Sequence, residues 1–272
     1  MKADLHIHSN CSDGSDSPEA IVAKAKEYGL GAIAVTDHDN VDGVERAIAA
    51  GRKCGVQVVS GLELSTYSIV EVHILGYGVD VRNAQLCERL ERMRTQRKDR
   101  IAQILDNLAK MGIRLDASPL EGIKGSVGRP HVARLLIEAG YAANVNDAFD
   151  RYLGEGASAY VPSRRITPIE GVRLINAAGG VAGLAHPMLI KQKDRFFDLV
   201  QGLVAVGLGG IETYYPSHTA QDIAVLESIA KKNRLITTGG SDYHGYGKAG
   251  DIGCSGYELS AQTARALGIK LK

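Results

Sequence analysis

The sequence predicts an α/β fold, in which a largely parallel sheet closes into a barrel and a helical domain is inserted. Short apolar runs rich in Val, Ile and Ala alternate with helical patterns up to Val79 and again after Thr167. Between these parts, roughly 85 residues show helical and loop patterns without a convincing strand. We therefore expect a barrel domain formed by residues 1–81 and 161–272, and an inserted helical cap domain formed by residues 82–160.

The first half of the barrel is predicted from its apolar runs and helix signals. Ser17 followed by Pro18 is a typical helix start, because serine caps the first turn and proline suits the first helical position. A second helix is expected over residues 41–54. The expected strands cover residues 3–8, 32–36, 56–63 and 72–79.

The second half repeats the same order of strand and helix. A helix is expected from Thr167 to Ala178, a later one ends at Val206, and a further one precedes the last strand. The expected strands cover residues 180–185, 210–212 and 235–239. This repetition favours a parallel sheet.

The cap domain is expected to begin with a long helix over residues 83–111. Its apolar residues recur at helical spacing and predict one buried face. The stripe consists of Leu86, Leu90, Met93, Ile101, Ile104, Leu108 and Met111. Arg97 and Arg100 interrupt it, which is costly at a core-facing position unless the guanidinium groups are paired.

Composition excludes several classes of partner. The 272 residues carry a net charge of only +1, so we expect no general attraction to duplex DNA or to an anionic membrane. The four cysteines are widely spaced, and the chain begins directly with a strand. A cytoplasmic protein without thiolate-bound zinc is therefore expected. The oligomeric state stays open.

Histidines and carboxylates follow or occupy most of the predicted strands. His6 and His8 lie two residues apart on one strand, so both imidazoles point to the same side of the sheet. Because βα loops open into one shared mouth, residues that follow parallel strands converge there. The candidate metal ligands are His6, His8, Asp13, His38, Glu63, His73, His186, Asp242 and His244.

Each of these residues has an ordinary explanation when taken alone. Asp13 could belong to a turn, Glu63 could be a surface acid, and Asp242 could cap a helix. The convergence of the whole set is what these explanations leave out. The set is too large for one ion, so it predicts two or three divalent ions, with Glu63 as a bridge. Imidazole and carboxylate ligands favour Mn²⁺, with Zn²⁺ and Fe²⁺ as alternatives.

The motifs that contain these residues resemble those of the PHP (polymerase and histidinol phosphatase) domain phosphoesterases. The matching segments are Asp4-Leu5-His6-Ile7-His8, Ser12-Asp13-Gly14, Thr36-Asp37-His38-Asp39, Gly61-Leu62-Glu63, Ala185-His186-Pro187 and Ser241-Asp242-Tyr243-His244. The resemblance implies a distorted (β/α)7 TIM-like barrel with a site for three metal ions. It also implies the ligand sets: His6, His8, Glu63 and Asp242 for one ion, Glu63, His73 and His186 for a second, and Asp13, His38 and His244 for a third.

Such a centre suits hydrolysis of phosphate esters, because cations offset the charge that repels an anionic nucleophile. A hydroxide that bridges two ions is available near neutral pH, since coordination lowers the pKa of water from ~15.7 to about 7. It would attack phosphorus in line with the leaving oxygen. Asp37, Asp39 and His244 are candidate proton donors or supporting groups.

Substrate selection is expected to come from the cap domain. Arg97 and Arg100 would meet an anion, or alternatively an acid of the cap. Arg129 precedes a proline that begins a helix, and a helix N-terminus beside an arginine can bind an anion. His131 and Arg134 are further candidates, together with His244 of the barrel. His218 lacks a partner motif, and a surface position is expected for it.

The resemblance implies a phosphorylated nucleotide or short RNA as substrate. Family members with a cap insertion hydrolyse 3′,5′-bisphosphonucleotides such as pAp, or trim 5′-phosphorylated RNA. The surplus arginines favour such a second phosphate over histidinol phosphate, which has one phosphate and an amine. A histidinol-phosphate phosphatase remains the first alternative. A metal-dependent amidohydrolase and a non-catalytic PHP module are further alternatives.

Overall fold

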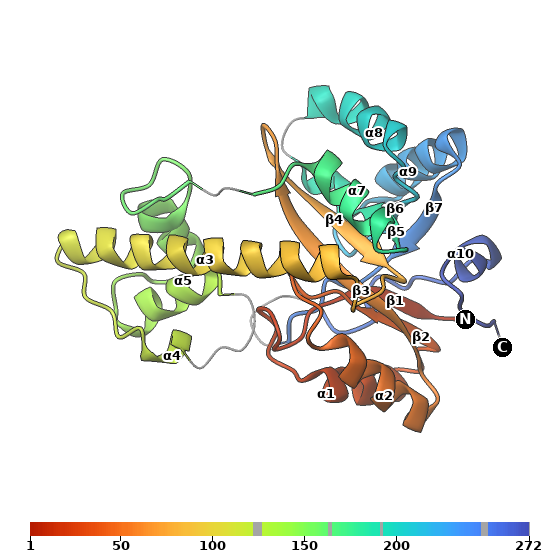
Figure 1. The fold of residues 1–272 in the computed structure, drawn as a ribbon, viewed down its shortest axis with the longest axis horizontal. Helices are drawn as coiled ribbons and strands as arrows, with labels where there is room; N and C mark the ends of the chain where they lie inside the picture. The colour runs from red at the N-terminus through yellow and green to blue at the C-terminus, as the bar shows by residue number, and fades with distance from the viewer. Residues whose placement is uncertain (122–126, 163–164, 191–192, 246–249, 272) are drawn as a thin grey trace. The chain divides into compact units, whose positions relative to one another are not determined.

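The chain forms two compact units. The computed structural model describes residues 1–121, 127–162, 165–190, 193–245 and 250–271. The first unit, called the barrel unit below, comprises Met1–Glu88 and Arg165–Lys272. The second, called the helical unit, comprises Arg89–Arg164. Figure 1 shows the strands gathered in the first unit and helices in the second.

The barrel unit contains a seven-stranded sheet whose strands follow their order in the sequence. The strands are β1 (Ala3–Ile7), β2 (Ala32–Val35), β3 (Gln57–Tyr67), β4 (Glu71–Tyr77), β5 (Val181–Leu184), β6 (Gly210–Tyr214) and β7 (Ile236–Gly239). Ile7 at the end of β1 forms a bridge with Tyr243, which follows β7, so the sheet nearly closes on itself. The predicted TIM-like barrel is confirmed.

The direction of β4 differs from the parallel arrangement that the sequence favours. β4 runs antiparallel to both β3 and β5, whereas the remaining neighbours pair in parallel. Only residues 68–70 connect β3 to β4, and a parallel return needs a crossover of a dozen or more residues. The hairpin also extends β3 to Tyr67, so Glu63 lies within the strand and not at its predicted end.

Helices of the barrel unit flank the sheet (Figure 1). They are α1 (Pro18–Glu27), α2 (Val44–Cys54), α7 (Pro168–Ala177), α8 (Phe196–Ala205), α9 (Ala220–Asn233), α10 (Ala261–Ala266) and the short turns η2 (Pro187–Leu189) and η3 (Lys193–Arg195). The predicted cap at Ser17 is confirmed, because its side chain accepts a hydrogen bond from the backbone N–H of Ala20. Thr167 likewise caps α7 together with Glu170.

Two hydrophobic clusters support the strands that carry the site. Leu5 packs with Leu75 and Tyr77 in one cluster, and Ile7 packs with Ile33 and other residues in a second. Every residue of β1 and β2 is buried, including the polar ones in β1. The polar side chains of β1 therefore need partners inside the protein.

The helical unit has its own core. It contains most of α3 (Ala84–Lys110), followed by α4 (Ser118–Glu121), α5 (Arg129–Glu138), α6 (Val145–Ala148) and the π-helical turn η1 (Phe149–Leu153). The predicted stripe of α3 is buried from Leu86 to Leu108, while Met111, past the end of the helix, is exposed. Ile101 and Ile104 pack in the same cluster as Val132 and Leu136 of α5.

Candidate metal centre

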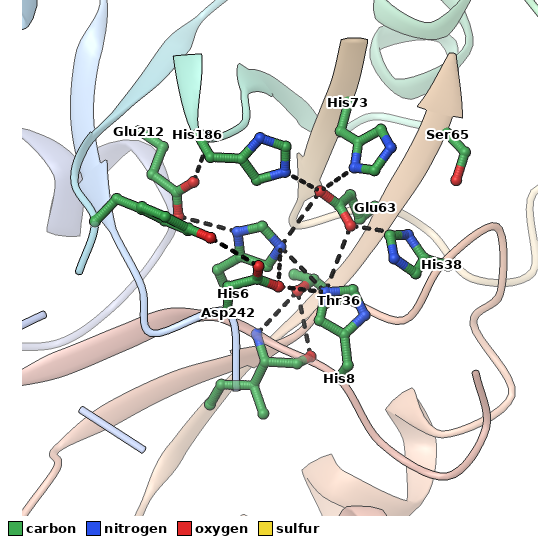
Figure 2. A network of polar contacts seen from close by, with 12 residues as sticks. His6, His8, Thr36, His38, Glu63, Ser65, His73, His186, Glu212 and Asp242 are labelled. Carbon is green, nitrogen blue, oxygen red and sulfur yellow. Dashed lines mark hydrogen bonds and ion pairs between the residues drawn. The ribbon is translucent and has the colours of Figure 1, made fainter. Parts of the chain in front are cut away.

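Most of the predicted ligands converge on one region of the barrel unit (Figure 2). His6 Nε2 lies 3.1 Å from His8 Nε2, 3.4 Å from Glu63 Oε1 and 3.5 Å from Asp242 Oδ1. Two ligands bound at about 2.1 Å to one ion lie roughly 3.0–3.4 Å apart at octahedral or tetrahedral angles. The separations among these four residues are therefore those of a preformed ligand set.

Glu63 lies close to five of the other predicted ligands. Its Oε1 lies 3.0 Å from His73 Nδ1 and 3.1 Å from His186 Nε2, while its Oε2 lies 2.8 Å from His38 Nδ1. Burial by itself raises the pKa of Glu63, but the surrounding histidines, His73 and His38 foremost, bring that pKa well below its usual value. Glu63 is therefore anionic and reaches every histidine that the second predicted set contains.

A further group surrounds Asp13, in the loop after β1. Asp13 Oδ1 lies 3.3 Å from His244 Nε2 and Oδ2 lies 3.9 Å from His38 Nε2. Asp13, His38, His244 and His8 each offer an atom within 4.8 Å of the others. His38 thus faces Asp13 with one ring nitrogen and Glu63 with the other. The structure brings all nine predicted ligands together, and their division among particular ions stays a prediction.

The donor set fits divalent cations. Four buried side-chain atoms here have no hydrogen-bond partner among the described residues: His8 Nδ1, Asp13 Oδ1, His38 Nδ1 and Glu63 Oε2. Although His38 Nδ1 and Glu63 Oε2 are close, they do not meet with the geometry of a hydrogen bond. Buried polar atoms without partners are costly, and a bound cation would satisfy them.

The pKa values of His6, on β1, and of His8, just after it, are shifted in opposite directions. Burial opposes a charge on His6, yet Glu212, Glu63 and Asp242 raise its pKa well above the ordinary value. For His8, burial and the neighbouring imidazoles of His244 and His38 lower the pKa well below that value. The mixture of facing acids and bases is characteristic of functional sites.

Backbone strain is concentrated around the same residues. Asp39, His186 and Asp242 are non-glycine residues with positive φ, at 47°, 25° and 52°. Such conformations cost on the order of 1–3 kcal/mol each and persist only where other contacts hold them. The backbone N–H of Asp242 donates to His6 O at 2.9 Å, and Asp39 Oδ1 accepts from the N–H of Ser65 at 2.8 Å.

Asp37 and Asp4 hold loops that carry predicted ligands or adjoin them. Asp37 accepts hydrogen bonds from the N–H and hydroxyl of Ser9 and from the hydroxyl of Ser12, at 2.6–2.7 Å. Asp4 accepts from the N–H and hydroxyl of Ser241 at 2.9 and 2.6 Å. Burial raises the pKa of both carboxyl groups. These contacts favour an anchoring role for Asp37, and its predicted part in proton transfer stays a prediction, as does that of Asp39.

Three residues near the centre are not among the residues predicted from the sequence. Glu212 lies on β6 and contacts His6, and the hydroxyl of Tyr215 donates to Asp242 Oδ2 at 3.0 Å. The acid within the apolar strand Gly210–Tyr214 was the available signal for Glu212. Asp4 was visible in the first motif, but its role depends on the distant Ser241.

The surface position expected for His218 is wrong. His218 is buried, its Nδ1 donates to the carbonyl oxygen of Thr213 at 2.9 Å, and its ring lies 5.3 Å from that of Tyr215. Thr213 lies on β6, five residues before His218. The short loop after β6 therefore turns the histidine ring back toward the end of that strand.

Within the helical unit, the two predicted clusters of basic residues approach each other at the start of α5. A β-carbon at Gly128, the N-cap of α5, would lie 3.5 Å from Arg97 Nη1. Arg129 Nη1 donates to the carbonyl oxygen of Leu153 at 3.1 Å, and Arg100 Nε donates to that of Val161 at 2.7 Å.

The other two candidates of this unit differ in exposure. His131 is buried, and its Nδ1 accepts a hydrogen bond from the N–H of Gly128 at 3.0 Å, whereas Arg134 is exposed. His131 therefore supports the start of α5. Substrate binding by all five residues stays a prediction.

A close approach of two backbones at the centre gives a first testable prediction. A β-carbon at Gly240 would lie 2.6 Å from His6 N and would also overlap the His6 side chain. We expect Gly240→Ala to displace His6 and to destabilise the metal-free protein by about 1–3 kcal/mol, the usual cost of overpacking. Urea unfolding monitored by circular dichroism measures this. Gly202→Ala is the control, because an added β-carbon there meets nothing within 4 Å. Equal stability of the two variants would contradict the prediction.

Comparison with known proteins agrees with this geometry. The PHP domain matches residues 4–253 of the chain. The chain therefore belongs to the PHP domain family. Among the described residues, no helix is both long enough and apolar enough to cross a bilayer.

Several relatives resemble the chain over most of its length. A 5′-3′ exoribonuclease of Haemophilus influenzae is 33% identical over 89% of this chain and 90% of the relative. A phosphoribosyl 1,2-cyclic phosphate 1,2-diphosphodiesterase of Eggerthella lenta is 35% identical, covering 93% and 98%. A 3′,5′-nucleoside bisphosphate phosphatase of Chromobacterium violaceum is 31% identical, covering 92% and 90%. These relatives differ in substrate while sharing reactions at phosphate esters.

A solved structure shows the same fold. The crystal structure of a putative metal-dependent phosphoesterase from Bifidobacterium adolescentis superimposes with a TM-score of 0.85 at 28% identity. The superposition covers 97% of this chain and 94% of the other.

Proposed function

We propose that the protein is a metal-dependent phosphoesterase that acts on phosphorylated nucleotides, with 3′,5′-bisphosphonucleotides such as pAp as the preferred class and 5′-phosphorylated short RNA as a further one. The observation that carries the proposal is the cluster of buried imidazole and carboxylate atoms without hydrogen-bond partners. Relatives named as a bisphosphate phosphatase and an exoribonuclease support the substrate class.

The proposed ligands are the nine residues that converge at the barrel mouth. Two or three divalent ions, Mn²⁺ first and Zn²⁺ or Fe²⁺ as alternatives, would offset the charge of the phosphate and lower the pKa of water near neutrality. The protein's own contribution is to hold the donors before the ions arrive, so that little reorganisation remains for the reaction.

His244 is assigned to ligation in preference to proton transfer. Its Nδ1 donates to the carbonyl oxygen of Asp242 at 2.7 Å, which leaves Nε2 as the lone-pair atom that faces Asp13. A ring fixed in this tautomer suits a metal ligand. Asp39 remains the candidate for proton transfer, together with Asp37.

Comparison of four substrates tests the proposal. The Mn²⁺-loaded protein is offered pAp, a 5′-phosphorylated oligoribonucleotide, histidinol phosphate and an acyl amide, and kcat/KM is measured for each. We expect the first two to be turned over fastest. Preference for histidinol phosphate would favour the first alternative, hydrolysis of the amide alone would favour an amidohydrolase, and no turnover with full metal content would favour a non-catalytic module.

A cyclic phosphodiester is a second candidate substrate. The Eggerthella lenta relative named as a cyclic phosphate diphosphodiesterase is 35% identical to this chain, and the match covers almost the whole length of the relative. The same metal centre would serve either reaction, because both break a P–O bond. Hydrolysis of phosphoribosyl 1,2-cyclic phosphate with a higher kcat/KM than that of pAp would favour this candidate.

The basic residues of the helical unit are proposed to bind the phosphate that is not hydrolysed. Arg97→Ala and Arg129→Ala are each expected to raise KM for pAp by about tenfold to hundredfold, since a hydrogen bond to a charged group contributes about 1.5–3 kcal/mol. The KM for AMP, which lacks the second phosphate, should change little. Lys98→Ala, at an exposed position of the same helix, is the control. Unchanged KM for pAp in both variants would contradict the assignment.

A further inference from the structure

Glu212 is a buried acid that uses both of its carboxylate oxygens on proposed metal ligands (Figure 2). Its side chain is fully buried on β6, the strand for which no ligand is predicted. Oε1 lies 3.0 Å from His6 Nδ1, and Oε2 accepts the backbone N–H of His186 at 2.6 Å. One carboxylate thus contacts ligands from β1 and from the loop after β5.

The first contact determines which nitrogen of His6 faces the centre. A carboxylate only accepts hydrogen bonds, so a contact between Glu212 as a carboxylate and His6 Nδ1 places the proton on Nδ1. In a neutral ring, Nε2 then holds the lone pair, and this atom lies among His8, Glu63 and Asp242. A carboxylate behind a ligating histidine fixes the tautomer and the ring orientation in this way.

The second contact holds the backbone of another proposed ligand. His186 has φ 25° and ψ 57°, a conformation that residues with a β-carbon rarely adopt. The hydrogen bond from its N–H to Glu212 stabilises this turn, which directs Nε2 to within 3.1 Å of Glu63 Oε1.

We propose that Glu212 is a positioning residue that sets the affinity of two metal ions together, through the tautomer of His6 and through the turn at His186. This inference rests on the proposed metal centre. Glu71 provides a contrast, because among the described residues its contacts are to one proposed ligand, His73 Nε2 at 3.0 Å, and to Arg165.

Replacing Glu212 by Gln separates its two hydrogen-bonding roles, at His6 and at His186, from a simple packing role. An amide has one acceptor and one donor group, whereas the two contacts of Glu212 both require acceptors. If the oxygen faces His186, the NH₂ group faces His6 Nδ1 and drives the proton to Nε2. If the amide is reversed, two donors meet at His186. Glu212→Gln therefore loses one contact in either orientation while keeping the size of the side chain.

The test is a Zn²⁺ titration of the metal-free full-length protein in competition with a chromogenic chelator. We expect Glu212→Gln to weaken two Zn²⁺ sites by about tenfold to hundredfold each, the usual effect of losing a partner behind a metal ligand. Glu71→Gln should weaken one site only. Glu227→Gln is the matched control. Glu227 accepts a hydrogen bond from the hydroxyl of Tyr214, which lies on β6 like Glu212, and it contacts no proposed ligand among the described residues.

Nitrogen-15 NMR of the histidines adds a readout that a packing role would not change. In the Zn²⁺-loaded wild type, His6 should carry its proton on Nδ1, and in Glu212→Gln this signal should be lost or moved. Glu212→Asp keeps the charge but shortens the side chain, so its Zn²⁺ affinity should lie between those of the wild type and of Glu212→Gln. This variant replaces Glu212→Gln in the test if the Gln variant does not fold. Wild-type Zn²⁺ affinity in Glu212→Gln, or a loss confined to one site, would overturn the proposal. Normal metal binding without turnover of any phosphate ester would instead refute the proposed function alone.

Discussion

Replacing Glu63 by Gln is expected to lower kcat/KM for phosphate esters by about three orders of magnitude or more. Glu63 is 1% exposed, and its carboxylate oxygens lie within 3.4 Å of a ring nitrogen of five other proposed ligands, His6, His8, His38, His73 and His186. Gln lacks the charge and would offer the ions one neutral oxygen in place of two anionic ones. Charge stabilisation by a metal is worth several kcal/mol, and each 1.36 kcal/mol changes the rate about tenfold.

Metal content and steady-state kinetics check this prediction together. Elemental analysis should show the loss of at least one equivalent of Mn²⁺ per chain, and circular dichroism should show the barrel intact. Glu45→Gln is a suitable control, since Glu45 pairs with Arg82 on the surface. A Glu63→Gln enzyme with full metal content and near wild-type kcat/KM would show that Glu63 is not the shared ligand.

The convergence of the proposed ligands was predictable because it follows from strand geometry. The period of a strand places His6 and His8 on one side, and the carboxyl ends of parallel strands meet at one mouth. These rules use only the local sequence and the general architecture. They bring His38, His186 and Asp242 to the same place without knowledge of any individual contact.

The supporting contacts were not predictable, because they join residues far apart in the sequence. Asp4 holds Ser241, 237 residues later, and Glu212 holds His6, 206 residues earlier. A buried acid in a strand signals the need for a partner but does not identify it. The antiparallel direction of β4 was missed for a different reason. The short connection 68–70 indicates a hairpin, but the alternation of strands and helices elsewhere in the chain favoured a parallel sheet.

In the helical unit, too, local features were predictable from the sequence and contacts between elements were not. The periodic stripe of α3 predicted its buried face, because helical spacing alone places Leu90 and Ile104 on one side. The approach of Arg97 to Gly128 depends on how α3 packs against α5, which no local pattern specifies.

Metal binding is expected to raise Tm, and to raise it more at pH 9 than at pH 6. In the metal-free protein, burial disfavours a charge on His73, but Glu63 and Glu71 raise its pKa to about 9. The pKa of His6 is also raised. Because these folded-state values exceed the unfolded value near 6.5, the protonated rings stabilise the metal-free fold fully below about pH 6.5 and lose that effect as the pH rises through the folded values.

Metal ions compete with the same protons, since a ligating nitrogen must be unprotonated. The metal-free Tm should therefore fall between pH 6 and pH 9, while the apparent affinity for Mn²⁺ rises. At a free Mn²⁺ concentration of 100 Kd, binding stabilises the fold by about 2.7 kcal/mol per site, or on the order of 5–10 °C. Differential scanning calorimetry with Mn²⁺ and with a chelator measures both curves. Titration calorimetry in two buffers of different ionisation enthalpy should show proton release at pH 7. A Tm increase that is independent of pH, without proton release, would mean that His6 and His73 are not displaced from their protons by the metal.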